Sequence, residues 1–290
     1  MRVYGKRASG SKFRWPELSL VVGACLWGVV WYPMRWLQSR GLMGLVLTLT
    51  LYVSALLVSL PATWRAFREW PGRVHVLLPL ALLAGWTNIA FVLAILHGNI
   101  VRIMLLFYLS PAWTLILARI FLGELIHARA LWTLVLSLCG ATILLWPSAP
   151  GAVSFSGSDL LGLSAGMAFS ASNIMTRALS GVSLAAKSTC VWMGVSVLSL
   201  SLILSQQLPW PALGAPIWIA AVALGGLGIL TMTWLIQFGV TRLPAQRSSV
   251  LMLTELLAGA LSQQWLTNET LSEISWIGGG LIAVAAWLAA

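Results

Sequence analysis

The acidic residue at position 255 is the strongest candidate for chemistry in this sequence. Glu255 lies in the interior of an apolar run, and if that run is a membrane-spanning helix the carboxyl group is roughly 12 Å deep. An ionised carboxylate at this depth is costly unless it is paired or faces water. The position is typical of a proton carrier, but a protonated carboxyl that hydrogen-bonds a neighbouring helix fits the same pattern.

Other polar and aromatic side chains lie at similar depth in other apolar runs. Each polar group needs a partner from protein, water or substrate, so we treat these residues as candidates for a substrate cavity, with interhelical hydrogen bonds as the alternative. The tryptophans either line this cavity or pack and face lipid, and a tryptophan-rich cavity suits an aromatic or amphipathic solute, including a cation through cation–π contact. The candidates are Trp27, Trp31, Asn88, Tyr108, Trp113, Asn173, Trp234 and Gln237.

Pro111 is the candidate hinge. In the middle of a helix a proline frees a backbone carbonyl and produces a kink, which either acts as a hinge or only shapes the bundle; Pro33 and Pro79 predict similar kinks. Arg102 and Arg247 lie near opposite ends of two apolar runs, where contact with lipid headgroups is favoured over a gating role.

The sequence does not predict a catalytic or metal site. The three histidines lie at separate loop edges without the spacing of metal ligands, and no nucleophile–base pairing or phosphate-binding loop is present. We therefore expect no catalytic residue, no metal and no cofactor, and we expect the protein not to be an enzyme.

Membrane-spanning helices must position these residues. Of the 290 residues 59% are hydrophobic and 8% are charged, against roughly 25% charged in an ordinary soluble domain. One soluble core cannot hide so much apolar surface, so lipid is the expected solvent. A span needs about 20 mostly apolar residues, and we predict ten spans near 18–37, 44–63, 75–96, 101–119, 129–147, 158–177, 186–204, 214–239, 248–266 and 273–290.

The distribution of basic residues explains the net charge of +10. If both ends of the chain are cytoplasmic, the outer segments hold only Arg35, Arg40 and Arg102, and the inner segments hold Arg2, Lys6, Arg7, Lys12, Arg14, Arg65, Arg68, Arg73, Arg119, Arg129, Arg177, Lys187, Arg242 and Arg247. This is a strong positive-inside bias. The basic residues are therefore interpreted as topology signals, and we expect no nucleic-acid partner.

Two patterns recur in the same order along the chain and predict an internal duplication. The first is Ala24-x-x-Trp27-Gly28 followed by Arg35, and it recurs 142 residues later as Gly166-x-x-Phe169-Ser170 followed by Arg177. The second runs from Arg102 to Glu124 and recurs 145 residues later from Arg247 to Glu269. Because each copy has five spans, an odd number, the second copy must be inverted, as in many transporters. The expected organisation is a basic segment at 1–17, one five-helix repeat at 18–147 and an inverted repeat at 158–290.

These motifs resemble those of the EamA family in the drug/metabolite transporter superfamily. The family's first-helix pattern is similar to Gly23-Ala24-x-x-Trp27-Gly28 with Arg35 in this sequence. The family's fourth-helix signature is similar to Leu109-Ser110-Pro111-Ala112-Trp113-Thr114 followed by Phe121-Leu122-Gly123-Glu124. In the second half Glu255-Leu256 replaces the Ser-Pro pair. The resemblance implies ten helices in inverted repeats around a central cavity, and export of metabolites, amino acids or drugs.

The leading hypothesis is a secondary transporter that works by alternating access and exports small metabolites, amino acids or amphipathic or aromatic drugs. It is driven either by proton exchange through Glu255 or by the gradient of the solute itself. Import of a small metabolite is an alternative. An intramembrane lipid- or acyl-modifying enzyme needs a cluster of His, Asp or Ser near one membrane face, which the chain lacks, and a sensor or assembly subunit needs more extramembrane surface. We expect a monomer or homodimer in the bacterial cytoplasmic (inner) membrane.

Overall fold

The computed structural model describes residues 15–98, 100–145, 156–267 and 272–289, and in these ranges all regular structure is helical. The basic residues from Arg2 to Arg14, the link at 147–151 and Glu269 lie outside the described residues. Predictions that rest on them remain predictions.

The helices lie at the positions of the predicted spans. In the first half they are α1 (Trp15–Val29) and α2 (Trp31–Ser39), α3 (Gly44–Thr63) with the 3₁₀ turn η1 (Trp64–Glu69), α4 (Val74–His97), α5 (Ile100–Phe107), α6 (Ser110–Leu117) with the π-helical turn η2 (Ala118–Leu122), and α7 (Ala128–Leu144). In the second half they are α8 (Gly157–Ala178), α9 (Leu184–Ser205), α10 (Ala215–Ala223) with the π-helical segment η3 (Leu224–Ile229) and α11 (Leu230–Arg242), α12 (Ala245–Met252), α13 (Thr254–Leu266) and α14 (Glu273–Ala289).

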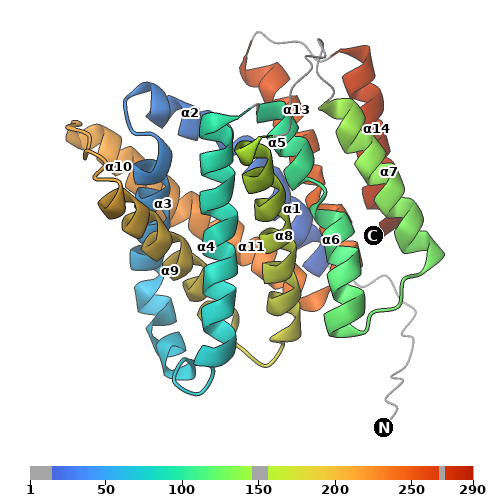
Figure 1. The fold of residues 1–290 in the computed structure, drawn as a ribbon, viewed down its shortest axis with the longest axis horizontal. Coiled ribbons are helices and arrows are strands. Elements are labelled where there is room, and N and C mark those ends of the chain that lie inside the picture. Colours follow the sequence, from blue (N-terminus) through green and yellow to red (C-terminus); the bar gives the residue numbers. More distant parts are fainter. Residues whose placement is uncertain (1–14, 99, 146–155, 268–271, 290) are drawn as a thin grey trace.

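Successive helical segments run back and forth between two ends of the bundle (Figure 1). The two ends of the bundle are named lower and upper after their positions in Figure 1. The helices that begin at the lower end start at Trp15, Val74, Ala128, Leu184 and Ala245. The helices that begin at the opposite, upper end start at Gly44, Ile100, Gly157, Ala215 and Glu273.

Among the described residues six helical segments are long and apolar enough to cross a membrane: Trp15–Ser39, Gly44–Glu69, Val74–His97, Arg102–Leu122, Leu184–Ser205 and Ala215–Arg242. The helices α7 and α14 are apolar but shorter. On α4, Leu78, Leu82 and Trp86 are about half exposed at a spacing of four residues, which places them on one face. Such an exposed apolar stripe is stable in lipid, and the protein is an all-helical membrane protein.

Two prolines explain where long helical segments are interrupted. Pro111, the second residue of α6, has no N–H to bond the carbonyl of Phe107, and the helix is broken between Phe107 and Ser110. Pro33 has the same relation to Val29, where α1 ends and α2 follows. Pro79, in contrast, lies inside α4, which continues unbroken from Val74 to His97.

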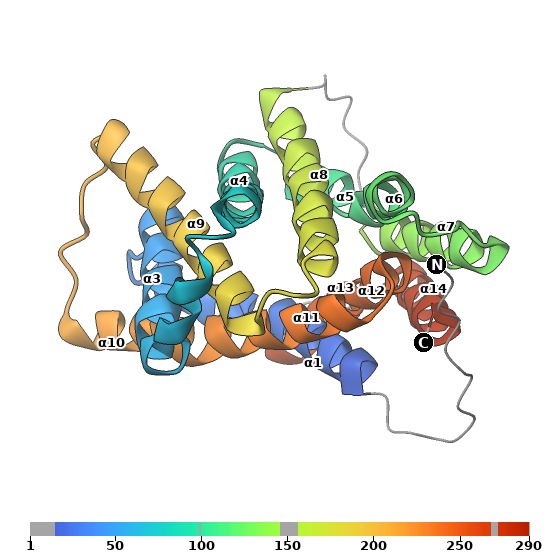
Figure 2. The same cartoon turned by 90° about the horizontal axis from the view of Figure 1, so that it is seen from below.

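Two groups of helices pack around α1 and α8. Helix α8 packs against α4, α5 and α6, and we call these helices with η2 the α8 unit. Helix α1 packs against α11, α12 and α13, which together form the α1 unit. Figure 2 shows α8 beside α4 and α1 beside α11, with α7 and α14 paired at the edge of the bundle.

Glycines allow the closest helix contacts within both units. A Cβ atom at Gly28 of α1 would overlap the Glu255 carbonyl of α13, and one at Gly166 of α8 would lie 2.6 Å from the Phe107 carbonyl of α5. Small residues at helix interfaces are typical of membrane proteins, because they let backbones approach. Gly28 and Gly166 are thus packing residues.

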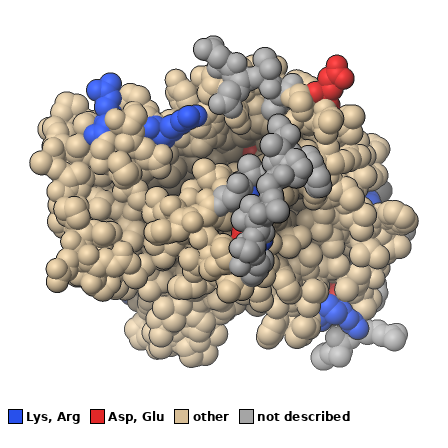
Figure 3. Space-filling model, turned by 45° about the horizontal axis from the view of Figure 1, so that its top comes forward, with Lys and Arg blue, Asp and Glu red and all other residues tan. Residues whose placement is uncertain are grey.

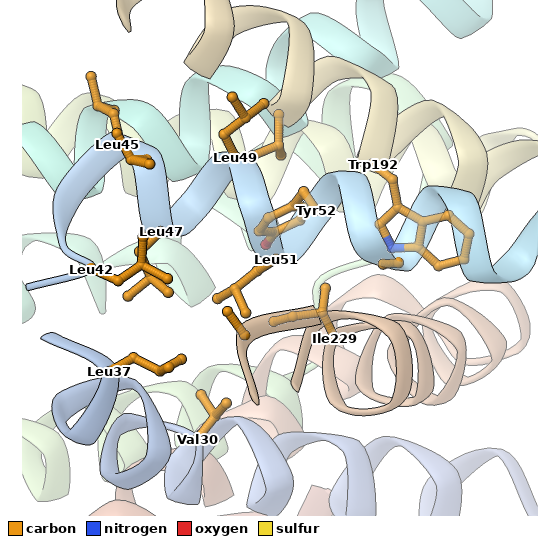
Figure 4. Close-up of a cluster of buried hydrophobic side chains, with 14 of the residues drawn as sticks. Val30, Leu37, Leu42, Leu45, Leu47, Leu49, Leu51, Tyr52, Trp192 and Ile229 are labelled. Atoms are coloured by element: carbon orange, nitrogen blue, oxygen red, sulfur yellow. The ribbon is translucent and has the colours of Figure 1, made fainter. Parts of the chain in front are cut away.

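The largest apolar cluster holds α3, α9 and η3 together. Figure 4 shows Leu51 and Tyr52 of α3 with Trp192 of α9 and Ile229 of η3 among its members. Trp192 is completely buried, and its indole N–H donates to the hydroxyl of Thr233 at 3.2 Å. This bond satisfies the polar atom that the ring brings into the core.

Basic residues are concentrated at the lower end. The described helices and loops place Arg35, Arg40 and Arg102 at the upper end, seen obliquely in Figure 3, and place Arg65, Arg68, Arg73, Arg119, Arg129, Arg177, Lys187, Arg242 and Arg247 at the lower end. The asymmetry has the form that a positive-inside bias requires.

Three basic residues have partners within the protein. Lys187 is completely buried, and its ammonium group donates to the Thr176 carbonyl at 2.8 Å and the Thr241 hydroxyl at 3.1 Å, where the ends of α8 and α11 carry negative partial charge. Arg102 pairs with Asp159 at 3.1 Å, and Arg247 with Glu17 at 3.0 Å. Each of these two arginines therefore has a carboxylate partner on a neighbouring helix, and contact with lipid headgroups stays a prediction.

Candidate functional site

Tyr108 and Glu255 form a hydrogen bond between the two units. The phenol of Tyr108 donates to Oε1 of Glu255 at 3.1 Å. Tyr108 lies in the break between α5 and α6, and Glu255 lies in the first turn of α13, two residues after the break at Leu253. Helix interruptions thus bring both side chains to the boundary between the α8 unit and the α1 unit, away from both ends of the bundle.

A small cavity adjoins this pair. Its volume is about 10 Å³, the space that one water molecule needs. The lining comes from α5, α6 and α8 on one side and from α12 and α13 on the other, and consists of Phe107, Tyr108, Ser110, Thr114, Phe169, Ser249, Met252, Leu253 and Glu255. The carboxyl group of Glu255 therefore borders a void that lies between the units.

One wall of the cavity is aromatic. The ring of Phe107 lies 4.8 Å from Phe91, 5.4 Å from Tyr108 and 5.4 Å from Phe169, measured between centroids. A carboxyl group beside aromatic faces can attract a cation, and a carboxyl beside a single water can exchange a proton with it. Both kinds of chemistry are available at Glu255.

Two of the predicted cavity residues have protein partners elsewhere. Asn88 of α4 accepts a hydrogen bond from the phenol of Tyr52 at 2.7 Å and donates to the Ala84 carbonyl at 3.0 Å. The indole of Trp31 donates to the hydroxyl of Ser262 at 2.9 Å, which ties α2 to α13. For these two residues the structure shows interhelical bonds, the alternative weighed from the sequence.

Three predicted residues bury a polar atom that has no hydrogen-bond partner among the described residues: Nε1 of Trp113, Nε1 of Trp234 and Oε1 of Gln237. Such atoms are rare in folded proteins and call for a water or a ligand. Trp27 and Trp234 pack against the apolar cluster of Figure 4, and Asn173 of α8 is half-buried. The structure thus joins Tyr108 and Glu255 at one cavity, and the other candidates do not line it.

A wider groove lies at the upper end. Its volume is about 510 Å³, and it is lined by Trp31, Tyr32, Arg35, Trp36, Ser39, Leu266 and Thr267. Figure 3 shows that the upper end is hollowed near its middle. Trp31 is the only predicted cavity residue in the lining of this groove.

Sequence reasoning missed several residues of the site. Phe107 and Phe169 line the cavity although they read as ordinary apolar residues, and no local signal separates them from other phenylalanines. Tyr52, which bonds Asn88 outside the cavity, could have been found from the sequence, because a phenol in the middle of a predicted span needs a partner. Within the described ranges no group of His, Cys, Asp and Glu side chains could hold a metal ion.

Comparisons with known proteins agree with this architecture. Residues 14–146 match the model of the EamA-like transporter family, so the resemblance seen in the first-half motifs is confirmed there. The chain is similar to an uncharacterized transporter of Archaeoglobus fulgidus, with 25% identity over 278 residues that cover 95% of this chain and 96% of the relative. The family match and the apolar helices identify a multi-pass integral membrane protein.

A solved structure shares the fold. One crystal structure of a protein superposes with a TM-score of 0.76 at 21% sequence identity, over 94% of this chain and 96% of that chain. The likeness covers both halves, including the region beyond residue 146 that the family model does not match.

Proposed function

We propose that this protein is a secondary transporter that moves a small molecule across the bacterial inner membrane by alternating access, with Glu255 as the proton-coupling residue. The family match and the transporter relative support transport rather than catalysis. Export of metabolites, amino acids or amphipathic drugs is the direction implied by the family resemblance. The single observation that carries the coupling role is the Tyr108–Glu255 bond beside a cavity at the boundary between the units.

Ten membrane-spanning helices in two inverted repeats are part of this proposal, and helix packing supports them. The contacts of α1 with α11 and α13 correspond to the contacts of α8 with α4 and α6 when the halves are exchanged. The contact of α3 with η3 corresponds in the same way to that of α9 with α4, while the pairs α3–α9 and α7–α14 correspond to themselves. A pseudo-two-fold axis in the membrane plane produces this pattern.

Individual residues support the same correspondence. The ion pairs Arg102–Asp159 and Arg247–Glu17 are related by offsets of 145 residues for the arginines and 142 for the acids. These are the offsets found in the sequence motifs, and the two pairs lie at opposite ends of the bundle. The helix breaks at Tyr108 and Leu253 are also 145 residues apart. Independent contacts therefore agree on one relation between the halves.

The lower end is proposed to face the cytoplasm, because it carries most of the described basic residues and basic residues are retained on that side. Both chain ends would then be cytoplasmic. In this orientation the upper groove faces the outside.

Transport by the purified protein in sealed liposomes tests the proposal. Candidate solutes (amino acids, aromatic amines and organic cations) are supplied with and without a pH gradient, and solute uptake and internal pH are followed together. Glu255→Gln keeps the size of the side chain and removes its titration, so we expect the pH-gradient-driven component to be lost. The matched control is Glu273→Gln, since Glu273 is an exposed carboxylate at the start of α14.

The two variants separate coupling from transport. Equal pH-driven flux in Glu255→Gln and Glu273→Gln would remove Glu255 from the mechanism, whereas the absence of any solute flux in the native protein over the panel would count against transport itself. Turnover of a solute in detergent, without compartments, would favour the enzyme alternative.

A further inference from the structure

The polar contacts between the two units gather at the lower end. Both carboxylate oxygens of Glu124, which follows η2 in the α8 unit, lie 3.1 Å from the backbone N–H of Ala245, the first residue of α12. The next side chain, Gln246, donates to the Leu125 carbonyl at 3.2 Å. Two consecutive residues of α12 are therefore bonded to the segment that follows η2.

Arg177 of α8 completes this layer. Its Nε lies 3.9 Å from Glu124, and its Nη1 donates to the Thr241 carbonyl near the end of α11 at 2.8 Å. The guanidinium group holds the carboxylate from the α8 side and also bonds the α1 unit directly. Below the Tyr108–Glu255 bond, the two units are thus joined by charged groups.

The upper end has a different arrangement. Helix α6 packs against α12 in the lower half of the bundle, but among the described residues no comparable packing joins α5 and α13, the corresponding pair in the upper half. The groove of about 510 Å³ at the upper end is lined by α2 and the end of α13, and Figure 3 shows a hollow at this end. Among the described residues the two units are therefore joined at the lower end and lack comparable packing at the upper end.

Helix α12 depends on Glu124 for its cap. The first N–H groups of a helix have no partner within the helix, and Asp, Asn, Ser or Thr normally supplies one from the N-cap position. Here that position is Pro244, and α12 has no side-chain cap of its own. A carboxylate at a helix N-terminus also interacts favourably with the helix dipole. Glu124 supplies this interaction from the other unit.

We propose that Glu124 is a positioning residue that holds the cytoplasmic end closed by capping α12 from the opposite unit, and that this cap must open during each transport cycle. The proposal rests on the proposed function, because a closed end has a role only in alternating access. When the units separate, water replaces Glu124 at the N–H of Ala245. Opening therefore requires loss of one charged cap and of the Arg177 contact, and Glu124 shifts the equilibrium toward the outward-open state.

Distances between spin labels test this proposal without measuring transport. One pair at Ile126 and Leu18 spans the units at the lower end, and a second pair at Leu160 and Trp265 spans them at the upper end; all four side chains are exposed. The labels are placed in a protein whose native cysteines are alanine, at Cys25, Cys139 and Cys190. Glu124→Ala should increase the population with separated lower labels by roughly tenfold, the factor expected for loss of one helix cap, and should shorten the upper distance.

Glu69→Ala is the matched control. Glu69 is also at the lower end, accepts the backbone N–H of the N-cap residue Ser183 at 3.1 Å and pairs with Arg73 at 3.6 Å. It joins η1 to the start of α9, however, and does not bridge the two units. We expect the Glu69 variant to keep the native distance distributions.

The outcomes are decisive in either direction. Unchanged lower distances in Glu124→Ala, or the same separation in Glu69→Ala, would overturn the assignment of Glu124. If Glu124→Ala does not give a monodisperse protein, Glu124→Gln keeps an acceptor oxygen without the charge and should show a smaller shift in the same direction. Failure of the native protein to transport any solute would instead refute the proposed function, while the label distances still report on Glu124.

Discussion

Replacing Gly28 with alanine tests the packing that holds Glu255 in position. Gly28 lies on α1 where it crosses α13, and a Cβ atom there would overlap the Glu255 carbonyl and lie 2.8 Å from Cβ of Ala258 and 2.9 Å from N of Gly259. Real Cβ atoms essentially never lie within 3.0 Å of other heavy atoms. Two of these three neighbours are backbone atoms, so α13 itself must move.

The size of the effect follows from this geometry. Relief of the overlap requires a shift of α13 on the order of 1 Å, and overpacking of this kind costs roughly 1–3 kcal/mol. For a chain of this length that is a lower melting temperature by about 2–5 °C. The same shift would carry Glu255 away from Tyr108, and their bond, 3.1 Å in the native protein, would be lost together with most proton-coupled flux.

Gly280→Ala is the control, because a Cβ atom at Gly280 of α14 would meet no atom within 4 Å. Both substitutions raise helix propensity by the same amount, so the difference between the two variants isolates the packing. Melting temperatures are measured in one detergent, and flux is measured in liposomes. If Gly28→Ala melts and transports like Gly280→Ala, then α1 and α13 do not pack at Gly28 and the reasoning fails.

Two further predictions concern individual contacts. Tyr108→Phe removes the hydrogen bond to the Glu255 carboxylate, and a hydrogen bond to a charged group contributes about 1.5–3 kcal/mol. We therefore expect proton-coupled flux to fall roughly tenfold, whereas the control Tyr32→Phe, at a tyrosine of the upper groove, should leave the flux unchanged. Equal flux in the two variants would contradict a role for the bond. Double-mutant cycles with alanine should give the same coupling energy, about 1–2 kcal/mol, for Arg102–Asp159 and for Arg247–Glu17; melting measurements that show coupling in only one pair would contradict their proposed equivalence.

Composition and hydrophobic runs were sufficient to predict an all-helical membrane protein. The runs of about 20 apolar residues lie on helices of the structure, because length and hydropathy are the physical requirements for a span. The proline signal was equally direct at Pro111 and Pro33, where α5 and α1 end four residues before the ring. A kink was also predicted at Pro79, but α4 continues through this residue without interruption.

Side-chain partners were less predictable, because they depend on which helices become neighbours. Arg102 and Lys187 had the same signal in the sequence, a basic residue near a span end, but one pairs with Asp159 and the other is buried against two helix ends. Asn88 was a cavity candidate by depth alone, and its partner Tyr52 comes from α3. The depth of a residue in the membrane follows from its place in one apolar run, whereas the helix that faces it is known only from the fold.

The two halves show why a single carboxylate can serve the whole molecule. If the halves are the inverted repeats proposed above, the offsets of 145 and 142 residues make Ser110 correspond to Glu255 and Ser170 to Gly28. In one half the Ser170 hydroxyl bonds the Ser110 carbonyl at 2.7 Å, and in the other the bare backbone of Gly28 packs on the Glu255 carbonyl.

Both solutions hold the backbone at the helix break, but the second places a carboxyl group at the cavity where the first places a hydroxyl. If Glu255 couples transport, one proton per cycle is sufficient, because Ser110 does not titrate. In the proposed inverted repeat, two conformations of similar energy are expected, and the difference between Ser110 and Glu255 would make their balance depend on pH.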